Sequence, residues 1–170
     1  MKPGMFLCAV IGAALLVSAA GVSAGQGDQA LSDHQFLNEA ARGSLAEITL
    51  GQMAEAKARN PQVKQFAARM IADHSKALAE ARQIAERSGG QITQQMTQKH
   101  EKMAESLSKK SPDSFDRAYM QAMVEDHRST IGQFEAHVAS GDGHAAAYAE
   151  KHLPVVREHL AMAESIVSEL

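Results

Sequence analysis

The sequence contains no tryptophan, and phenylalanine and tyrosine together make up only 4% of its 170 residues. A chain so poor in aromatic residues must build its core mainly from alanine, leucine, isoleucine, valine and methionine. Alanine-rich segments favour helices, because alanine loses no side-chain entropy in a helix and lets helices pack closely. The alternating β-branched segments typical of strands are missing. We therefore expect one all-α domain.

Cysteine is almost absent too, because Cys8 is the only one and lies within an apolar N-terminal run. This run extends from Met5 to Val17, follows Lys2, and precedes the small residues Val22 and Ala24. That order is typical of a secretory signal peptide. The sequence thus predicts a signal peptide over residues 1–24, cleaved near Ala24, a flexible leader over residues 25–31 and a helical domain over residues 32–170.

Cleavage would leave a chain without cysteine, which excludes disulfides, thiolate metal sites, cysteine nucleophiles and covalently attached haem. Cys8 lies inside the apolar run rather than after it, which argues against a lipid anchor. The run is short for a membrane span, and no later segment is apolar enough for one. We expect a periplasmic or secreted protein with no membrane span in its mature chain.

An excess of positive charge is also lacking. The 17 basic residues stand against 20 acidic ones, and loss of Lys2 with the signal peptide leaves a net charge of −4 with histidine neutral. Charges of both signs are spread along the chain, as on the solvated surface of a helix bundle. Nucleic acid is therefore not an expected partner.

Capping signals divide the first half of the domain. Ser32 and Gln35 form a predicted capping box that opens a helix over about 32–58. Asn60 and Pro61 end this helix and begin the next, which extends to about Ser88, before two glycines.

The second half repeats these signals after a polar connection over residues 91–110, which has at most one short helix. Ser111 and Pro112 begin a third helix that reaches about Ser140, and residues 141–143 form a turn. A fourth helix follows, in which Pro154 is expected to cause a kink or a restart. Two short connections and a long one between the second and third helices predict an antiparallel four-helix bundle of the ferritin-like kind, with a single crossover.

One pattern occurs twice, in the second and third predicted helices. An aromatic residue is followed at equal spacing by methionine and by an Asp-His pair, as in Phe66, Met70, Asp73, His74 and again in Tyr119, Met123, Asp126, His127. Helical periodicity places both histidines on inward faces and both aspartates beside them.

The other two helices each add an inward polar residue. Glu47 lies on the inward face of the first helix, where Gly43 and Gly51 one turn to either side leave room for a close neighbour or a ligand. His159 lies on the inward face of the fourth helix. The candidate metal ligands are therefore Glu47, Asp73, His74, Asp126, His127 and His159.

Burying several ionisable groups in one layer is costly unless they pair with one another or bind a cation. Imidazole and carboxylate ligands suit iron, manganese, zinc or copper. The alternative is a hydrogen-bonded Asp-His network that only fixes the packing of the helices. No catalytic motif is present, so no reaction is predicted.

The kind of metal site is narrowed by a missing motif. The Glu-x-x-His pairs of di-iron bundles are absent, which favours a mononuclear or asymmetric site. Met70 and Met123, four residues before the two histidines, would suit Cu(I), although methionine at this spacing is usually core filler. Haem b held by methionine and histidine is a further alternative.

The remaining histidines and three glutamates are expected in solvent. They are His34, His100, His137, His144 and His152, and Glu39, Glu125 and Glu158.

The chain resembles the bacterial domain-of-unknown-function 4142 (DUF4142) family. The resemblance lies in the segments 36–51, 57–74, 115–127 and 153–160, which cover nearly the whole mature chain. It implies a secreted protein of ferritin-like fold, often labelled as an outer-membrane or exported protein, and it supplies no catalytic residues. We interpret such a label as periplasmic location or peripheral attachment.

Two hypotheses follow. The protein is either a periplasmic metal-binding bundle that uses the six candidate ligands, or a non-catalytic envelope or stress interaction module with a structural polar core. An envelope protein partner or a homo-oligomer is compatible with both.

Overall fold

The computed structural model describes Met1, residues 31–140 and residues 143–170. The predicted signal peptide, Cys8, nearly all of the predicted leader and the first two residues of the predicted turn at 141–143 lie outside the described residues. The described part consists of helices joined by short segments, with no strand among them, which confirms the predicted all-α class. Within it, no helix is both long enough and apolar enough to cross a membrane.

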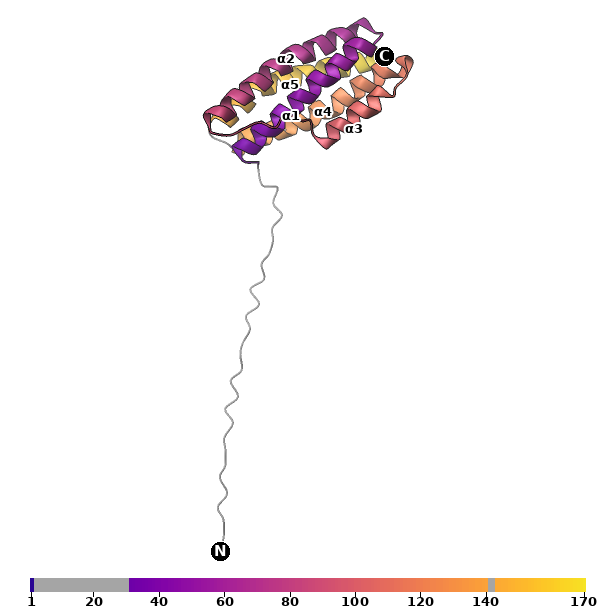
Figure 1. Ribbon diagram of the computed structural model, residues 1–170. Coiled ribbons are helices and arrows are strands. Elements are labelled where there is room, and N and C mark those ends of the chain that lie inside the picture. The colour runs from indigo at the N-terminus through magenta and orange to yellow at the C-terminus, as the bar shows by residue number, and fades with distance from the viewer. Residues whose placement is uncertain (2–30, 141–142) are drawn as a thin grey trace.

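The described residues form five helices: α1 (Asp33–Lys57), α2 (Pro61–Arg87), α3 (Gln98–Ser108), α4 (Pro112–Ser140) and α5 (His144–Glu169). The four long ones form an elongated bundle, and α3 lies against one side of it (Figure 1). Helices α1 and α2 pack together as one hairpin, and α4 and α5 pack together as the other.

The predicted helix boundaries are confirmed to within a residue or two. Ser32 and Gln35 form the capping box, and the side chain of Asn60 accepts a hydrogen bond from the backbone at the start of α2. Gly89 ends α2 with a φ of 73°, a conformation that glycine adopts without strain. α5 continues through Pro154, so of the two predicted alternatives, a kink or a restart, the restart is wrong.

The connection from α2 to α4 runs back along α1. Near its beginning, the Thr93 amide donates to the Asn38 side chain at 2.8 Å, close to the start of α1. At its end, Lys57 in the last turn of α1 donates to the Ser108 carbonyl. The connection therefore spans the bundle from one end to the other, as the predicted crossover requires.

The crossover makes α2 and α4 parallel. Both begin beside the turn between α1 and α2, where the Asp116 carboxylate accepts from the backbone amides of Arg59 and Asn60 at 3.2 and 2.7 Å. The Phe66 and Tyr119 rings, the first residues of the repeated pattern, lie 6.2 Å apart in an edge-to-face arrangement. Parallel helices thus place the two copies at the same depth.

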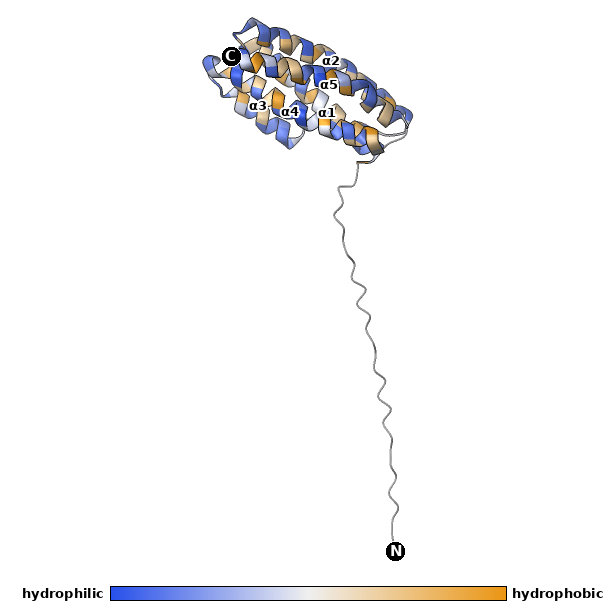
Figure 2. Cartoon of the chain, turned by 180° about the vertical axis from the view of Figure 1, so that it is seen from behind, coloured by the Kyte–Doolittle hydropathy of each residue, from blue (hydrophilic) through white to orange (hydrophobic). Residues whose placement is uncertain are grey.

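Two apolar clusters fill the two ends of the bundle. One gathers around Phe66, Met70, Tyr119 and Met123, and the other around Phe36, Phe134 and Tyr148. Along every helix, hydrophilic and hydrophobic stretches alternate, as expected when one face is packed and the other solvated (Figure 2). The candidate polar residues lie between the two clusters.

Candidate metal centre

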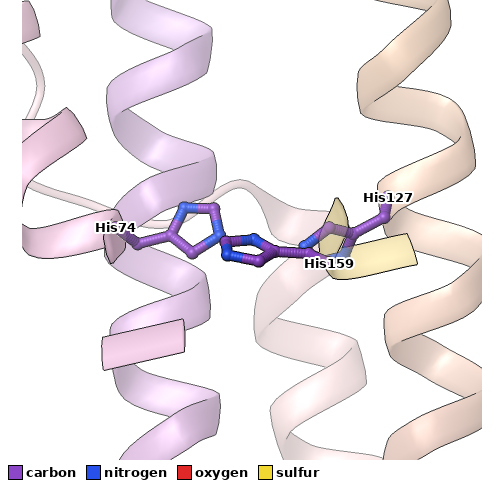
Figure 3. A group of neighbouring side chains, drawn as sticks. All are labelled: His74, His127 and His159. Atoms are coloured by element: carbon purple, nitrogen blue, oxygen red, sulfur yellow. The ribbon is translucent and has the colours of Figure 1, made fainter. Parts of the chain in front are cut away.

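Three histidines from three helices meet in this middle layer. His74 of α2, His127 of α4 and His159 of α5 each offer a ring nitrogen, and these nitrogens lie within 4.8 Å of one another. The ring centroids are 5.9, 5.4 and 5.5 Å apart, and the rings point toward a common region (Figure 3). We call these residues the histidine cluster.

Hydrogen bonds fix the tautomers of two of the rings. The Nδ1–H of His127 donates to the Met123 carbonyl oxygen at 2.9 Å, which leaves Nε2 with its lone pair. The Nε2–H of His159 donates to Oδ2 of Asp73 at 3.3 Å, which leaves Nδ1 with its lone pair. Carbonyl and carboxylate oxygens only accept, so the direction of both bonds is settled.

The nitrogens left over are buried and unpaired. Nε2 of His74, Nε2 of His127 and Nδ1 of His159 have no hydrogen-bond partner among the described residues. His74 as a whole is partly exposed, but this nitrogen is not. Buried polar atoms without partners are uncommon in native proteins. Nε2 of His127 and Nδ1 of His159 carry lone pairs that a cation can accept, and Nε2 of His74 supplies a third when its proton is on Nδ1.

All three rings are uncharged at neutral pH. Burial lowers the pKa of His127 to about 4, and the neighbouring His159 adds to this effect. Burial also lowers the pKa of His74 well below its ordinary value, assisted by His127 and His159. Burial lowers the pKa of His159 as well, although its hydrogen bond to the Asp73 carboxylate acts in the opposite direction. Neutral imidazole is the form that binds metal ions.

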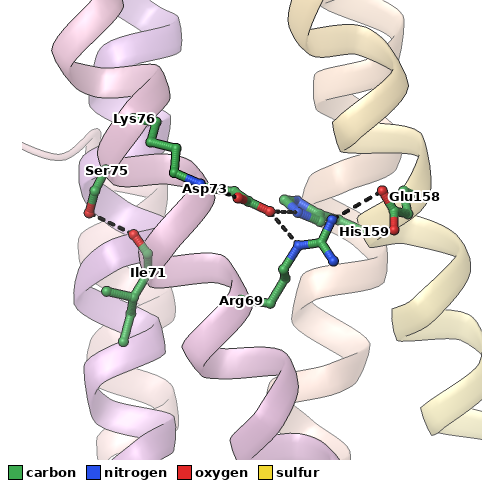
Figure 4. A network of polar contacts seen from close by, with 7 residues as sticks. All are labelled: Arg69, Ile71, Asp73, Ser75, Lys76, Glu158 and His159. Carbon is green, nitrogen blue, oxygen red and sulfur yellow. Dashed lines mark hydrogen bonds and ion pairs between the residues drawn. The ribbon is translucent and has the colours of Figure 1, made fainter.

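Asp73 supports the histidine cluster from outside it. Its carboxylate accepts from Nε of Arg69 at 2.5 Å and from Lys76 at 3.4 Å, besides the bond from His159 (Figure 4). Burial raises the pKa of Asp73, but these hydrogen bonds outweigh it and lower the pKa to about 2. Asp73 therefore orients His159 as an ionised acceptor.

Asp126 faces a different set of partners. Its Oδ1 accepts from Nζ of Lys99 at 2.5 Å and from Nε2 of His100 at 3.2 Å, both from α3. Burial raises its pKa, but these two bonds outweigh burial and hold the pKa below its ordinary value. The carboxylate is thus occupied by the crossover helix.

Glu47 of α1 lies close to Asp126 and is not part of the histidine cluster. It is 2% exposed, and neither of its carboxyl oxygens has a geometrically well-formed hydrogen bond to the described residues. Burial raises its pKa well above the ordinary value, and the charge and side chain of Asp126 raise it further. Burial and Asp126 therefore both favour the protonated carboxyl.

The histidine cluster and Glu47 line the same cavity, which measures about 290 Å³. The two glycines next to Glu47 play different parts. A Cβ on Gly51 would come within 2.8 Å of Ile71 of α2, so Gly51 allows close packing of the helices. A Cβ on Gly43 would meet nothing within 4 Å, so Gly43 leaves the cavity open.

The six predicted ligands therefore separate into groups. The structure brings His74, His127 and His159 together, places Asp73 behind His159, and directs Asp126 to α3 beside Glu47. The methionines suggested for Cu(I) are fully buried in the apolar cluster at one end and do not line the cavity.

Two other histidines were wrongly predicted to be solvated. His100 is 7% exposed because α3 packs against Asp126, and His137 is 3% exposed because it stacks on Phe36 with ring centroids 4.0 Å apart. His152, also expected in solvent, is partly buried and donates to Glu80 at 3.0 Å. The signal that marks the packed face of α3 is the spacing of Met103 and Leu107, which pack into the core three and seven residues after His100.

Three comparisons place the chain among known proteins. The profile described as "Domain of unknown function (DUF4142)" matches residues 18–166, so the chain belongs to this family, as its resemblance indicated. No curated protein matches the chain.

Two solved structures share the fold. One, "CopM in the Cu(II)-bound form", has a TM-score of 0.72 at 16% identity and covers 83% of this chain and 99% of its own. The other, "Crystal structure of DUF305 fragment from Deinococcus radiodurans", has a TM-score of 0.74 at 12% identity. The match covers 81% of this chain and 96% of that structure. At these identities the likeness concerns the helical fold alone.

Proposed function

We propose that this DUF4142 protein binds a single transition-metal ion through Nε2 of His74, Nε2 of His127 and Nδ1 of His159, as an exported protein of the cell envelope. Two observations support it: each of the three rings offers a nitrogen within 4.8 Å of the other two, and each ring has one buried nitrogen without a hydrogen-bond partner among the described residues. Metal–nitrogen bonds of about 2.0–2.1 Å put tetrahedral ligands roughly 3.4 Å apart. Binding would draw the rings together by side-chain rotation.

Second-sphere contacts favour this proposal. Metal-binding histidines usually donate their other ring N–H to a carboxylate or a carbonyl, which orients the ring and increases its basicity. The bonds from His159 to Asp73 and from His127 to Met123 are of these two kinds. Arg69 in turn holds Asp73 in place.

The ligand chemistry narrows the choice of metal. Imidazole suits copper, zinc and iron, whereas manganese prefers carboxylate oxygen. Neither Asp73 nor Asp126 is free to act as a ligand without losing its present partners. Together with the Cu(II)-bound structure of similar fold, this makes copper the first metal to test and zinc the second.

The test is metal content and affinity of the purified mature protein. We expect one Cu(II) or Zn(II) per chain by elemental mass spectrometry after loading, and loss of this metal in the His74→Ala and His127→Ala variants. His144→Ala is the matched control, because His144 is an exposed histidine of α5. Metal bound equally by all four proteins would contradict the proposal. Export is tested separately by recovering the chain, shortened near Ala24, from the periplasmic fraction.

The alternative is a structural polar core in an interaction module. In its favour, carboxylate–histidine pairs join α2 to α5 through Asp73 and His159, and α4 to α3 through Asp126 and His100. The His74→Leu variant separates the two hypotheses. If His74 serves only a metal, replacing its unpaired Nε2 with an apolar group stabilises the metal-free protein. Destabilisation of the metal-free protein would favour the structural alternative.

A further inference from the structure

The cavity beside the histidine cluster is larger than one metal ion needs. Its volume of about 290 Å³ is close to the lower end of the range for small-molecule pockets, roughly 300–1,000 Å³. Besides the histidine cluster, its walls include Ser44 and Glu47 of α1, Thr97 just before α3 and Gln133 of α4. The space beside the cluster is therefore lined by polar groups from several elements.

Glu47 is a buried acidic group of this wall, and Asp126 is close enough to act on its carboxyl. The Glu47 side chain is almost fully buried, neither of its oxygens has a geometrically well-formed hydrogen bond to the described residues, and the open space at Gly43 lies one turn away on the same helix. A protonated carboxyl is a hydrogen-bond donor as well as an acceptor. A buried group of this kind requires a well-formed hydrogen bond, and the cavity has room for a partner that makes one.

The charges around the cavity favour an anion as that partner. Three neutral imidazoles would leave the two positive charges of a divalent cation uncompensated in a buried site, which is costly. The Asp126 carboxylate is already neutralised by Lys99, and Asp73 lies behind His159 with Arg69. Three protein ligands also leave a fourth coordination position open.

We propose that the cavity is a binding site for a small anion, which coordinates the open position of the metal and accepts a hydrogen bond from the Glu47 carboxyl. This inference rests on the proposed metal site. It assigns Glu47 a role in ligand binding rather than in holding the metal.

Azide titration of the Cu(II)-loaded mature protein tests the inference, with the azide-to-copper charge-transfer absorption as the readout. Azide is expected to bind the wild type. Glu47→Leu should weaken azide binding about tenfold or more, because a hydrogen bond to a charged group is lost. Glu47→Gln retains a donor and should stay within about threefold of the wild type. Glu55→Gln, an exposed glutamate of the same helix that does not line the cavity, is the control and should leave azide binding unchanged.

A second variant tests the space rather than the donor. Gly43→Leu puts a side chain where a Cβ meets nothing within 4 Å, and should weaken azide binding while Cu(II) stays bound. Electron paramagnetic resonance of each copper-loaded variant reports nitrogen ligation independently of azide.

The outcomes are distinguishable. Two results would overturn the anion site and leave the metal site standing, provided that the copper spectra are normal. One is that the wild type shows no azide absorption, and the other is that wild type and Glu47→Leu bind azide with equal affinity. Failure of the wild type to bind copper or zinc would overturn both.

Discussion

The two Asp-His pairs of this protein are the same in sequence and different in use. Asp73 and His74 in α2 and Asp126 and His127 in α4 follow the same pattern, run in the same direction and lie at the same depth. Both histidines enter the histidine cluster. The aspartates diverge, because Asp73 accepts from His159 of that cluster and Asp126 accepts from Lys99 and His100 of the crossover helix.

This difference shows that the surrounding helices, rather than the local pattern, assign each aspartate its task. α2 has α5 beside it, so Asp73 meets a cluster histidine and supports the candidate metal centre. α4 is flanked by α3, so Asp126 anchors the crossover. Substitutions that affect the two aspartates differently can break or sharpen this comparison.

The largest expected difference concerns metal affinity. Asp73→Asn should weaken binding about 10- to 100-fold, because a partner that orients a ligating histidine contributes on that scale. Asp126→Asn should change affinity by less than about threefold, since its partners lie in α3. Calorimetric titration of both variants with Cu(II) or Zn(II) measures this ratio. Equal losses would show that both aspartates support the metal.

The reverse order is expected for stability. Asp126 is 7% exposed at its side chain, and Asp126→Asn should lower the free energy of unfolding by about 2 kcal/mol because charged hydrogen bonds to α3 are weakened. Urea denaturation measures the loss, and hydrogen exchange should become faster within residues 98–108. Asp113→Asn, on the same helix at an 83% exposed side chain, is the control. Unchanged exchange in α3 would contradict the anchoring role.

A smaller effect concerns pH and the histidine that follows each aspartate. The pKa of His127 is about 4 in the fold against 6.5 for an ordinary histidine, so the unfolded chain binds the proton more readily between these values. The metal-free protein is therefore stabilised above pH 6.5 and loses stability as pH falls toward 4, by about 1 kcal/mol for this residue at pH 5.5. Thermal unfolding of wild type and His127→Gln at pH 7.5 and pH 5.5 measures the difference. A wild type that loses no more stability than the variant would contradict it.

The smallest effect is expected at the methionines four residues before each histidine. Met70→Leu and Met123→Leu preserve volume in the apolar cluster and should cost less than about 1.5 kcal/mol each. Neither should alter metal affinity measurably, because neither side chain lines the cavity. A clear loss of Cu(I) affinity in these variants would restore the hypothesis of thioether ligands.

The fold was largely predictable because its signals are local. The capping box at Ser32, the Asn60-Pro61 step and Gly89 act within a few residues of the chain, and each marks a helix boundary that the structure confirms. The crossover followed from the length of one connection. Pro154 shows the limit, since packing keeps α5 continuous through it.

The candidate site was predictable only in part. Helical periodicity identified His74, His127 and His159 as inward, but it says nothing about which inward residues meet. The roles of Asp73 and Asp126 depend on contacts with histidines 86 and 26 positions away, respectively. The inward position of His100 follows from its spacing to Met103 and Leu107, but its bond to Asp126 depends on where α3 rests on the bundle.

The unpaired nitrogens of the histidine cluster imply that this region is locally frustrated in the metal-free chain. Desolvated imidazoles lie close together where leucine would pack without penalty. The middle of the bundle therefore lowers the stability that the two apolar clusters provide. A cation relieves that conflict, and occupancy then raises the melting temperature in proportion to the logarithm of free metal concentration. Thermal unfolding thereby becomes a gauge of how much metal the protein encounters.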